Sequence, residues 1–379
     1  MKRIRGRYGL MAALLALVTL LGAAFLFAVG IDAIEGRNDF QFYADSGTYH
    51  EAARGGLVGL DSLVDVVGIA GNFLGPLLVL RLTGENYYLV LLANAVMLFM
   101  SVASISRTLR LDSLRLAALL LLNPLTISSL LAVNKEILSL VFVAILLRGF
   151  ATRSRLLLGA AAVLSVLVRW QLTLVLMLLV AMVMPTGAWR GRRRIALLGL
   201  LAGLSVLYVL LLPVFEPIRA SFDLSVSDYE GSGFYEWLVG WQDIGAYWAV
   251  FPVKAAHLLF GLGLRIDRLL APANLYNDVW QLLHSSATLL MFIALWRARQ
   301  LRLDNDLVFI SAIYIAVFAL SPIYSPRYFY PVYVLWAIAL AAGTPALQLV
   351  RPARRRARPR TAFHSSAMTT VNPPMGNLR

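Results

Sequence analysis

The chain has 379 residues, of which 60% are hydrophobic and only 14% are charged. A soluble domain carries about 25% charged residues, so this composition excludes an ordinary soluble globule and indicates a membrane protein. The absence of cysteine excludes disulfides, zinc–thiolate sites and thiol nucleophiles. The net charge of +14 comes mainly from arginines in short segments beside apolar runs, which favours membrane topology and not nucleic-acid binding.

Apolar runs recur from one end of the chain to the other. The first follows a basic segment, residues 1–7, and is longer than the core of a signal peptide, so we expect an uncleaved helix. The sequence predicts an all-α, polytopic transmembrane bundle of about ten crossings that forms one catalytic domain over residues 1–350. The predicted crossings are 8–30, 86–106, 116–133, 136–150, 156–168, 172–185, 195–214, 275–296, 306–321 and 331–350.

The charges of the linkers give each linker a side of the membrane. With both termini in the cytosol, the cytosolic segments hold 24 of the 34 lysine and arginine residues, as expected for the positive-inside rule. The outer segments hold 17 of the 20 acidic residues, and three of them are the loops 31–85, 215–274 and 322–330. We therefore expect a multi-pass protein of the cell (inner) membrane, with a basic, disordered cytosolic tail at 351–379.

Several predicted helices are too short for a full perpendicular crossing. The runs 156–168 and 172–185 are expected to form a hairpin that turns at 169–171, because this turn keeps the arginines after 185 in the cytosol. A second turn is expected at 134–136, with a kink at Asn123-Pro124. We expect 71–82 to be interfacial or re-entrant, and 247–264 to lie in the outer interface, because Lys254 and His257 interrupt its apolar face.

Asp45 is the first candidate for chemistry, because an ionisable residue near the apolar zone is costly. It directly precedes a helix predicted to start at Ser46. A carboxylate in this place can deprotonate a sugar hydroxyl as general base. Asp39 is a second candidate for the base. An equal alternative is that Asp45 or Thr48 caps the helix, with Thr48 and Glu51 forming a capping box.

Three basic residues at predicted outer turns are candidate phosphate ligands. The chain has only three lysines, so a lysine at position 135, beside Glu136, suggests a point charge that meets a phosphate. The alternatives for Lys135 are a local ion pair or a side chain that snorkels at a helix end. Arg169 and Arg327 lie at the outer ends of short helices, where a guanidinium suits a phosphate. For Arg327 the alternative is an interfacial anchor among aromatic residues.

Metal and cofactor motifs give a weaker signal. Asp228 and Glu230 form a pair that can bind a divalent cation through carboxylate oxygens, although a solvated acidic loop explains them as well. The sequence contains no P-loop, dinucleotide-binding glycine fingerprint, zinc motif or nucleophile elbow. We therefore expect no metal site and no cofactor.

The motifs together resemble the GT-C superfamily of polytopic glycosyltransferases, in particular the bacterial members of polysaccharide and lipid-glycan pathways. The resemblance rests on Asp-Ser-Gly-Thr-Tyr at 45–49, Asn-Pro at 123–124, Asn-Lys-Glu at 134–136, the turn at Arg169 and Ser-Pro-Arg-Tyr-Phe-Tyr at 325–330. It implies an inverting transfer of a sugar from a polyprenyl-phosphate donor to a glycan or lipid-linked acceptor on the outer face. Membrane lipids and other glycan-assembly proteins are further expected partners.

The resemblance also implies a role for each candidate residue. Asp45, or Asp39, is the base, and the donor phosphate is bound by Lys135, Arg169 and Arg327. Residues expected to orient the substrates are Tyr49, His50, Glu136, Gln171 and Tyr328. The first outer loop has no DxD or ExD motif, which departs from the metal-dependent members of the superfamily.

Three other functions stay open at the level of sequence. A polysaccharide polymerase, which joins lipid-linked repeat units, would use the outer arginines equally well and differs in product length. A flippase or other transporter of lipid-linked sugars would need charged residues along a path open to both faces. A scaffold subunit of a glycan-assembly complex would not need Asp45. Fold analogy alone does not separate these functions.

Overall fold

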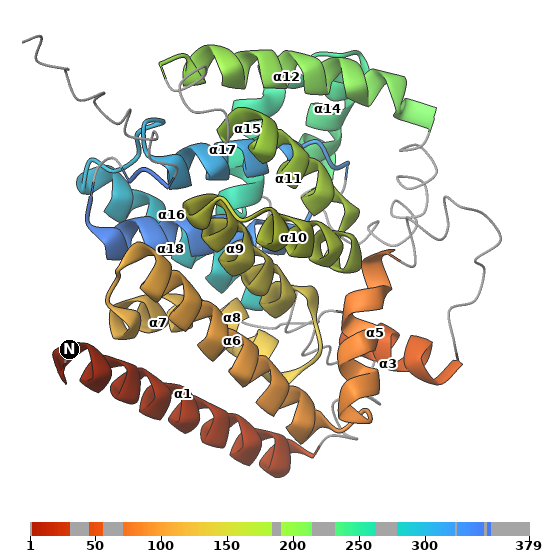
Figure 1. The fold of residues 1–379 in the computed structure, drawn as a ribbon. Coiled ribbons are helices and arrows are strands. Elements are labelled where there is room, and N and C mark those ends of the chain that lie inside the picture. The colour runs from red at the N-terminus through yellow and green to blue at the C-terminus, as the bar shows by residue number, and fades with distance from the viewer. Residues whose placement is uncertain are drawn as a thin grey trace, which may run out of the picture.

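A computed structural model describes residues 2–30, 45–55, 71–183, 191–213, 232–262, 279–322, 324–344 and 347–349. Within these ranges every regular element is helical, which confirms the predicted helical class. Figure 1 shows α1 (Lys2–Val29) along one edge of the bundle beside α6 (Tyr87–Leu109), and α12 (Arg193–Leu210) along the opposite edge. The candidates Asp39, Asp228 and Glu230 lie outside the described residues.

The other elements have between 4 and 18 residues. In chain order they are α3 (Ser46–Gly55), α5 (Gly71–Thr83), α7 (Ser113–Leu121), α8 (Pro124–Leu131), α9 (Lys135–Thr152), α10 (Arg155–Val168), α11 (Trp170–Val183), α14 (Ser232–Asp243), α15 (Tyr247–Phe260), α16 (Gln281–Arg297), α17 (Asp306–Phe318), the 3-10 helix η4 (Pro326–Phe329) and α18 (Tyr330–Ala342).

Helix length and composition identify candidate membrane spans among the predicted crossings. Among the residues that the structure describes, three helices are long and apolar enough to cross a membrane, namely Tyr8–Val29, Tyr87–Leu109 and Arg193–Leu210. The pair α7 and α8 makes a fourth candidate span, bent by 85° at its break. By contrast, α17 and α18 have 13 residues each, which is only about 20 Å of helix against about 30 Å of hydrocarbon. The count of ten crossings therefore stays a prediction.

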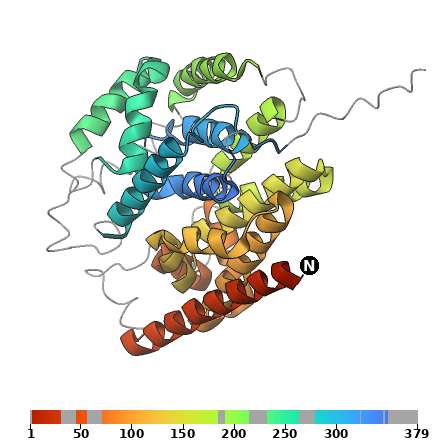
Figure 2. The same ribbon diagram turned by 90° about the vertical axis from the view of Figure 1, so that its left-hand side faces the viewer.

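The centre of the bundle is formed by α17 and α18. Almost every residue of these two helices is buried, and a helix that is apolar all round belongs in a core. Figure 2 shows α17 and α18 in the middle of the molecule, with α1 and α12 on opposite sides. The outer helices expose large apolar side chains such as Leu20 and Phe27 of α1 and Leu198 and Leu210 of α12, as expected for helices that face lipid.

The predicted kink at Asn123-Pro124 is confirmed. The Asn123 side chain accepts a hydrogen bond from the N–H of Leu125 and so caps α8, while Pro124 occupies the first helical position, where its missing N–H costs nothing. The buried His284 of α16 bonds Asn123 through Nδ1, 2.8 Å from the amide nitrogen. A side chain from another helix therefore fixes the break.

Gly75 of α5 lies directly against the backbone of α10. A Cβ at this position would lie 2.7 Å from the carbonyl oxygen of Leu167 and 3.0 Å from Cδ1 of Leu138. We expect Gly75→Ala to push the two helices apart and to lower the free energy of unfolding by about 1–3 kcal/mol, which a lower Tm in detergent would show. Gly199→Ala is the matched control, because nothing lies within 4 Å of its Cβ and alanine favours a helix. Equal Tm values for the two variants would contradict this close approach.

The placement of 247–264 in the outer interface stays a prediction. Lys254 and His257 of this segment are buried, and α14 and α17 pack against α15. The Lys254 ammonium donates to Oε1 of Gln242 and, at 3.0 Å, to the carbonyl oxygen of Ser321. The free carbonyls beyond the end of α17 attract a cation. Lys254 therefore anchors the segment that leads to η4.

Candidate functional site

Five of the predicted residues meet at one end of the bundle, although they come from four distant parts of the chain. We call Asp45, Lys135, Glu136, Arg169 and Arg327 the charged cluster. Two ion pairs, Arg327–Asp45 and Arg169–Glu136, hold it together. Both guanidinium groups lie over the ring of Tyr328, with Cζ of Arg169 at 4.2 Å and Cζ of Arg327 at 5.6 Å from its centre. Tyr328 therefore links the two pairs.

Asp45 precedes α3 and faces Arg327. Its carbonyl oxygen accepts the first helical bond, from the N–H of Tyr49 at 3.0 Å, while its carboxylate accepts from Nη2 of Arg327 at 2.9 and 3.2 Å. Thr48 is already the third residue of the helix, so a Thr48–Glu51 capping box at the start of α3 is wrong. Asp45 has φ of +55°, a costly conformation for a residue with a Cβ. This local cost suggests a function for its position.

The charge of Asp45 is set by its neighbours. Burial raises the pKa of the Asp45 carboxyl, but the positive charge of Arg327, followed by those of Lys135 and Arg169, outweighs burial and holds the pKa below its ordinary value. Asp45 is therefore ionised at neutral pH. The side chain keeps 38% of its surface exposed, against 14% for Arg327, so a substrate can reach the carboxylate.

Two asparagines place Lys135 and Glu136. Asn134 caps α9, with its side-chain oxygen accepting from the N–H groups of Glu136 and Ile137. Asn94, in the middle of the apolar α6, donates to three backbone carbonyls at the end of α8. Without these hydrogen bonds, the carbonyl groups at the end of α8 would be buried without a partner. The lysine ammonium lies 5.7 Å from the ring centre of Tyr49.

Arg169 occupies the break between α10 and α11, as predicted. Its backbone is extended, and hydroxyl groups on either side of the break, Ser165 and Thr173, bond each other at 2.8 Å. The guanidinium is buried and donates to Oε1 of Glu136 at 3.4 Å. Glu136 therefore lies where it can position Arg169.

The segment before α18 carries Arg327. The hydroxyl of Tyr314, in the central α17, donates to the carbonyl oxygen of Tyr328 at 2.9 Å and holds η4 against the core. At the other end of this segment the hydroxyl of Tyr235 donates to the carbonyl oxygen of Ser321, which also accepts from Lys254. Both ends of the segment are therefore fixed before any substrate binds.

Two of the residues predicted to orient the substrates pack mainly against protein. Tyr49 is buried against Phe73, edge to face, and His50 is buried in a stack on Tyr87 with ring centres 4.8 Å apart. Gln171 differs, because its buried Oε1 has no hydrogen-bond partner among the described residues. The structure thus places Lys135 over the ring of Tyr49, stacks His50 on Tyr87, and leaves Oε1 of Gln171 as a buried acceptor without a partner among the described residues.

The sequence analysis did not predict the structural roles of Asn94 and Tyr314, nor that the Lys254 side chain is buried inside the protein. The available signal was a lone polar group in an apolar helix, which must find a partner when it is buried. The structure contains no group of three or more His, Asp or Glu side chains suited to a metal ion within the described ranges. No protein-family model, curated protein or solved structure matches the chain.

Proposed function

We propose that the chain is a membrane glycosyltransferase that moves a sugar from a polyprenyl-phosphate donor to a hydroxyl group of a glycan or lipid-linked acceptor. The observation that carries the proposal is the charged cluster, which places one reachable carboxylate among three basic side chains. The resemblance to GT-C enzymes supports the same reading. We also propose that this end of the bundle faces outward from the cell membrane and that both termini are cytosolic.

The cluster suits a phosphate on grounds of charge. It contains three basic groups, Lys135, Arg169 and Arg327, but only two carboxyl groups, Asp45 and Glu136. Burial, together with the positive charge of Arg169, lowers the pKa of Lys135 to about 7. A phosphodiester supplies one negative charge with several acceptor oxygens and so favours the charged form of Lys135. A donor with a single phosphate therefore balances the cluster, while its lipid chain stays in the bilayer.

The reaction follows from these positions. The acceptor oxygen attacks the anomeric carbon from the face opposite the phosphate, and the bond between that carbon and the phosphate oxygen breaks. The electron pair stays on the leaving polyprenyl phosphate, where the basic groups stabilise the charge that develops. The proton of the acceptor hydroxyl passes to Asp45 as general base. The anomeric configuration is inverted.

Arg327 affects both the general base Asp45 and the binding of the donor phosphate. While it is bonded to Asp45 it lowers the pKa of that carboxyl and so weakens the base. A donor phosphate competes for the same guanidinium. Binding of the donor is therefore expected to weaken the Asp45–Arg327 pair and to raise the basicity of Asp45 only when a donor is present.

The test is an assay of the purified protein in lipid vesicles with labelled polyprenyl-phosphate sugars and polyprenyl-diphosphate sugars. We expect transfer of one sugar per acceptor from a monophosphate donor, with inverted configuration. A ladder of products from diphosphate-linked repeat units would identify a polymerase instead. Movement of lipid-linked sugar across the vesicle membrane without any transfer would identify a transporter. Either outcome would contradict the proposal.

A further inference from the structure

Large exposed aromatic side chains gather on α14 and on the turn that follows it. Phe234, Trp237 and Trp241 are three and four positions apart, which puts them on one face of the helix. Their rings touch in sequence, with Phe234 stacked on Trp237 at 5.7 Å and Trp237 edge to face with Trp241 at 6.1 Å. Ile244 and Trp248 extend the surface. We call these five residues the aromatic face, and each keeps 44% or more of its surface exposed.

The opposite side of α14 is fixed to the core. Leu238 and Gln242 are buried, and Nε2 of Gln242 donates to the carbonyl oxygen of Leu320 at 2.6 Å. The Tyr235 hydroxyl donates to the next carbonyl oxygen, that of Ser321, at 2.9 Å. A rotation of α14 that hid the aromatic face would break both hydrogen bonds at buried carbonyl groups. The aromatic face is therefore held outward.

The turn after α14 lies against the last two turns of α12. The N–H of Trp248 donates to Oγ of Ser205 at 3.1 Å, and a Cβ on Gly245 would lie 3.5 Å from Cγ2 of the exposed Val209. As a candidate membrane span of 18 residues, α12 is about 27 Å long, close to the thickness of the hydrocarbon core. Its last two turns therefore lie near one boundary of the hydrocarbon, and the aromatic face continues the exposed apolar surface of α12 there.

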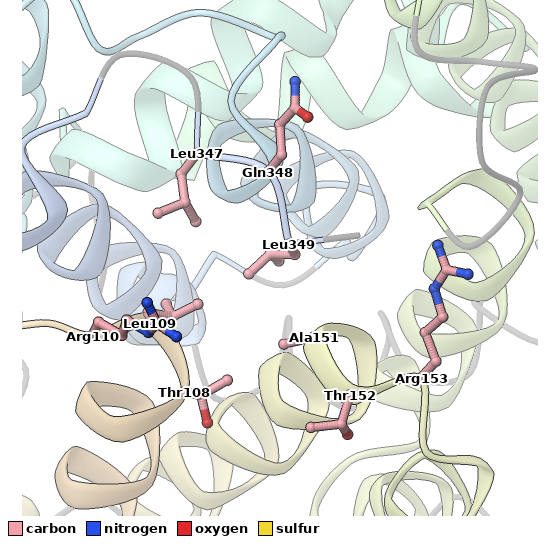
Figure 3. Close-up of a pocket in the computed structure, with 9 residues that line it drawn as sticks. All are labelled: Thr108, Leu109, Arg110, Ala151, Thr152, Arg153, Leu347, Gln348 and Leu349. Carbon is pink, nitrogen blue, oxygen red and sulfur yellow. The ribbon is translucent and has the colours of Figure 1, made fainter. Parts of the chain in front are cut away.

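The other boundary is marked by basic residues. Figure 3 shows Arg110 and Arg153 at the ends of α6 and α9, on opposite sides of a pocket that lies at the far end of α9 from Lys135. Both arginines are exposed. The aromatic face lies at the end of the charged cluster, because α14 bonds the carbonyls that precede η4. Arginines at one end and tryptophans at the other are typical of the two surfaces of a bilayer.

The composition of the aromatic face favours lipid over a soluble glycan. Glu236 is the one charged or polar side chain that is exposed between positions 234 and 249, all of which the structure describes. A surface that binds a glycan needs several hydrogen-bonding groups beside its aromatic rings. Indole instead suits the glycerol and carbonyl region of phospholipids, where its ring meets apolar groups and its N–H finds an acceptor.

We propose that the aromatic face inserts into the lipid interface on the side of the charged cluster and sets the depth of η4 in the bilayer. Because α14 bonds the carbonyls of Leu320 and Ser321, its position is passed directly to η4 and so to Arg327. The sequence predicts an interfacial position only for 247–264, and four of the five residues of the aromatic face precede that segment. The proposal stands whether or not the chain transfers sugars.

The natural absence of cysteine allows a direct measurement of depth. Single cysteines replace Trp241, Trp248, Ala202 and Arg302 of the full chain, each is labelled with a fluorescent maleimide, and the proteins are placed in phosphatidylcholine vesicles. Ala202 is exposed in the middle of α12, and Arg302 is exposed near the basic end. Quenching is measured with lipids that carry a nitroxide near the glycerol or near the end of the acyl chain, and with iodide in the water.

We expect the labels at 241 and 248 to be quenched most by the nitroxide near the glycerol. The label at Ala202→Cys should be quenched most by the deep nitroxide, and the label at Arg302→Cys by iodide. In a protein that also carries Trp237→Ser and Trp241→Ser, the label at 248 should gain access to iodide, while the label at 202 should not change.

Three results would overturn the proposal, provided that Tm shows each variant to be folded. Quenching at 241 and 248 by iodide alone would place the aromatic face in water, where it would suit a soluble glycan. Strongest quenching by the deep nitroxide would place it inside the hydrocarbon. Quenching by none of the three would show that protein, such as a second copy of the chain, covers it.

Discussion

Asp45→Asn is expected to lower kcat for sugar transfer by about 10²–10⁴-fold, the usual contribution of a general base. Asparagine keeps the shape of the side chain and accepts from Arg327, but it cannot take the proton of the acceptor. Donor binding should therefore survive, because the basic groups remain. Steady-state kinetics with a polyprenyl-phosphate sugar measure the loss in kcat, and equilibrium binding of the same donor measures what is kept.

Glu85→Gln is the matched control for the removal of a carboxylate near this end of the bundle. Glu85 pairs with the exposed Arg54 of α3 at 3.2 Å and takes no part in the charged cluster. An exposed pair contributes little to stability, so we expect kcat to stay within about twofold of wild type. Full activity of Asp45→Asn would make Asp45 a structural residue and would move the base elsewhere.

The pH dependence of kcat/KM provides an independent check on Asp45. This ratio reports ionisations of the free enzyme. The pKa of Asp45 lies below its ordinary value, so the carboxylate form is present above that value and is lost only as the pH falls through the lowered pKa. We therefore expect no loss of the Asp45 carboxylate between about pH 5 and pH 8. An acidic limb near neutral pH that disappears in Asp45→Asn would contradict the ion-paired ground state.

Arg169→Gln is expected to lower kcat by about 10²–10³-fold, because Arg169 is assigned to the charge that develops on the leaving phosphate. The residue is also structural, since removing it leaves the buried Glu136 without this partner. The double variant Arg169→Gln with Glu136→Gln removes both charges and restores an uncharged pair. Kinetics of the single and double variants, each with its Tm, separate the two roles.

If Arg169 acts on the phosphate, the double variant should regain stability but not kcat. Recovery of kcat in the double variant would show that Arg169 serves only to neutralise Glu136. Arg54→Gln is the control for the loss of an arginine near the same end, because Arg54 is exposed and bonded to Glu85. We expect its kinetics to match those of wild type.

The breaks in the helices were predictable because polar residues mark them. Asn-Pro at 123–124, Asn134 and Arg169 interrupt apolar runs, and a buried backbone needs such side chains to satisfy its free groups. The candidates Asp45, Lys135, Arg169 and Arg327 were found for the same reason. Their meeting was not predictable, since Asp45 and Arg327 are separated by 282 positions and only the packing of α3, α9, α10 and η4 brings them together.

Other features depend on packing alone. Hydropathy shows that Lys254 interrupts the apolar run of 247–264, but it does not show that the Lys254 side chain is buried inside the protein. Gly75 looks like any helical glycine until Leu167 of α10 is placed against it. Helix length alone does not settle the topology either, because an apolar run of 13 residues can cross only a locally thinned bilayer, and it can also enter and return or stay inside the core.

The most direct test of the central claim is a structure of the protein with bound polyprenyl phosphate, the product that leaves after transfer. We expect the phosphate to lie within hydrogen-bond distance of Lys135, Arg169 and Arg327, with the Asp45–Arg327 bond lengthened or broken. A phosphate bound elsewhere, with the Asp45–Arg327 pair unchanged, would contradict the assignment of the charged cluster as the donor site.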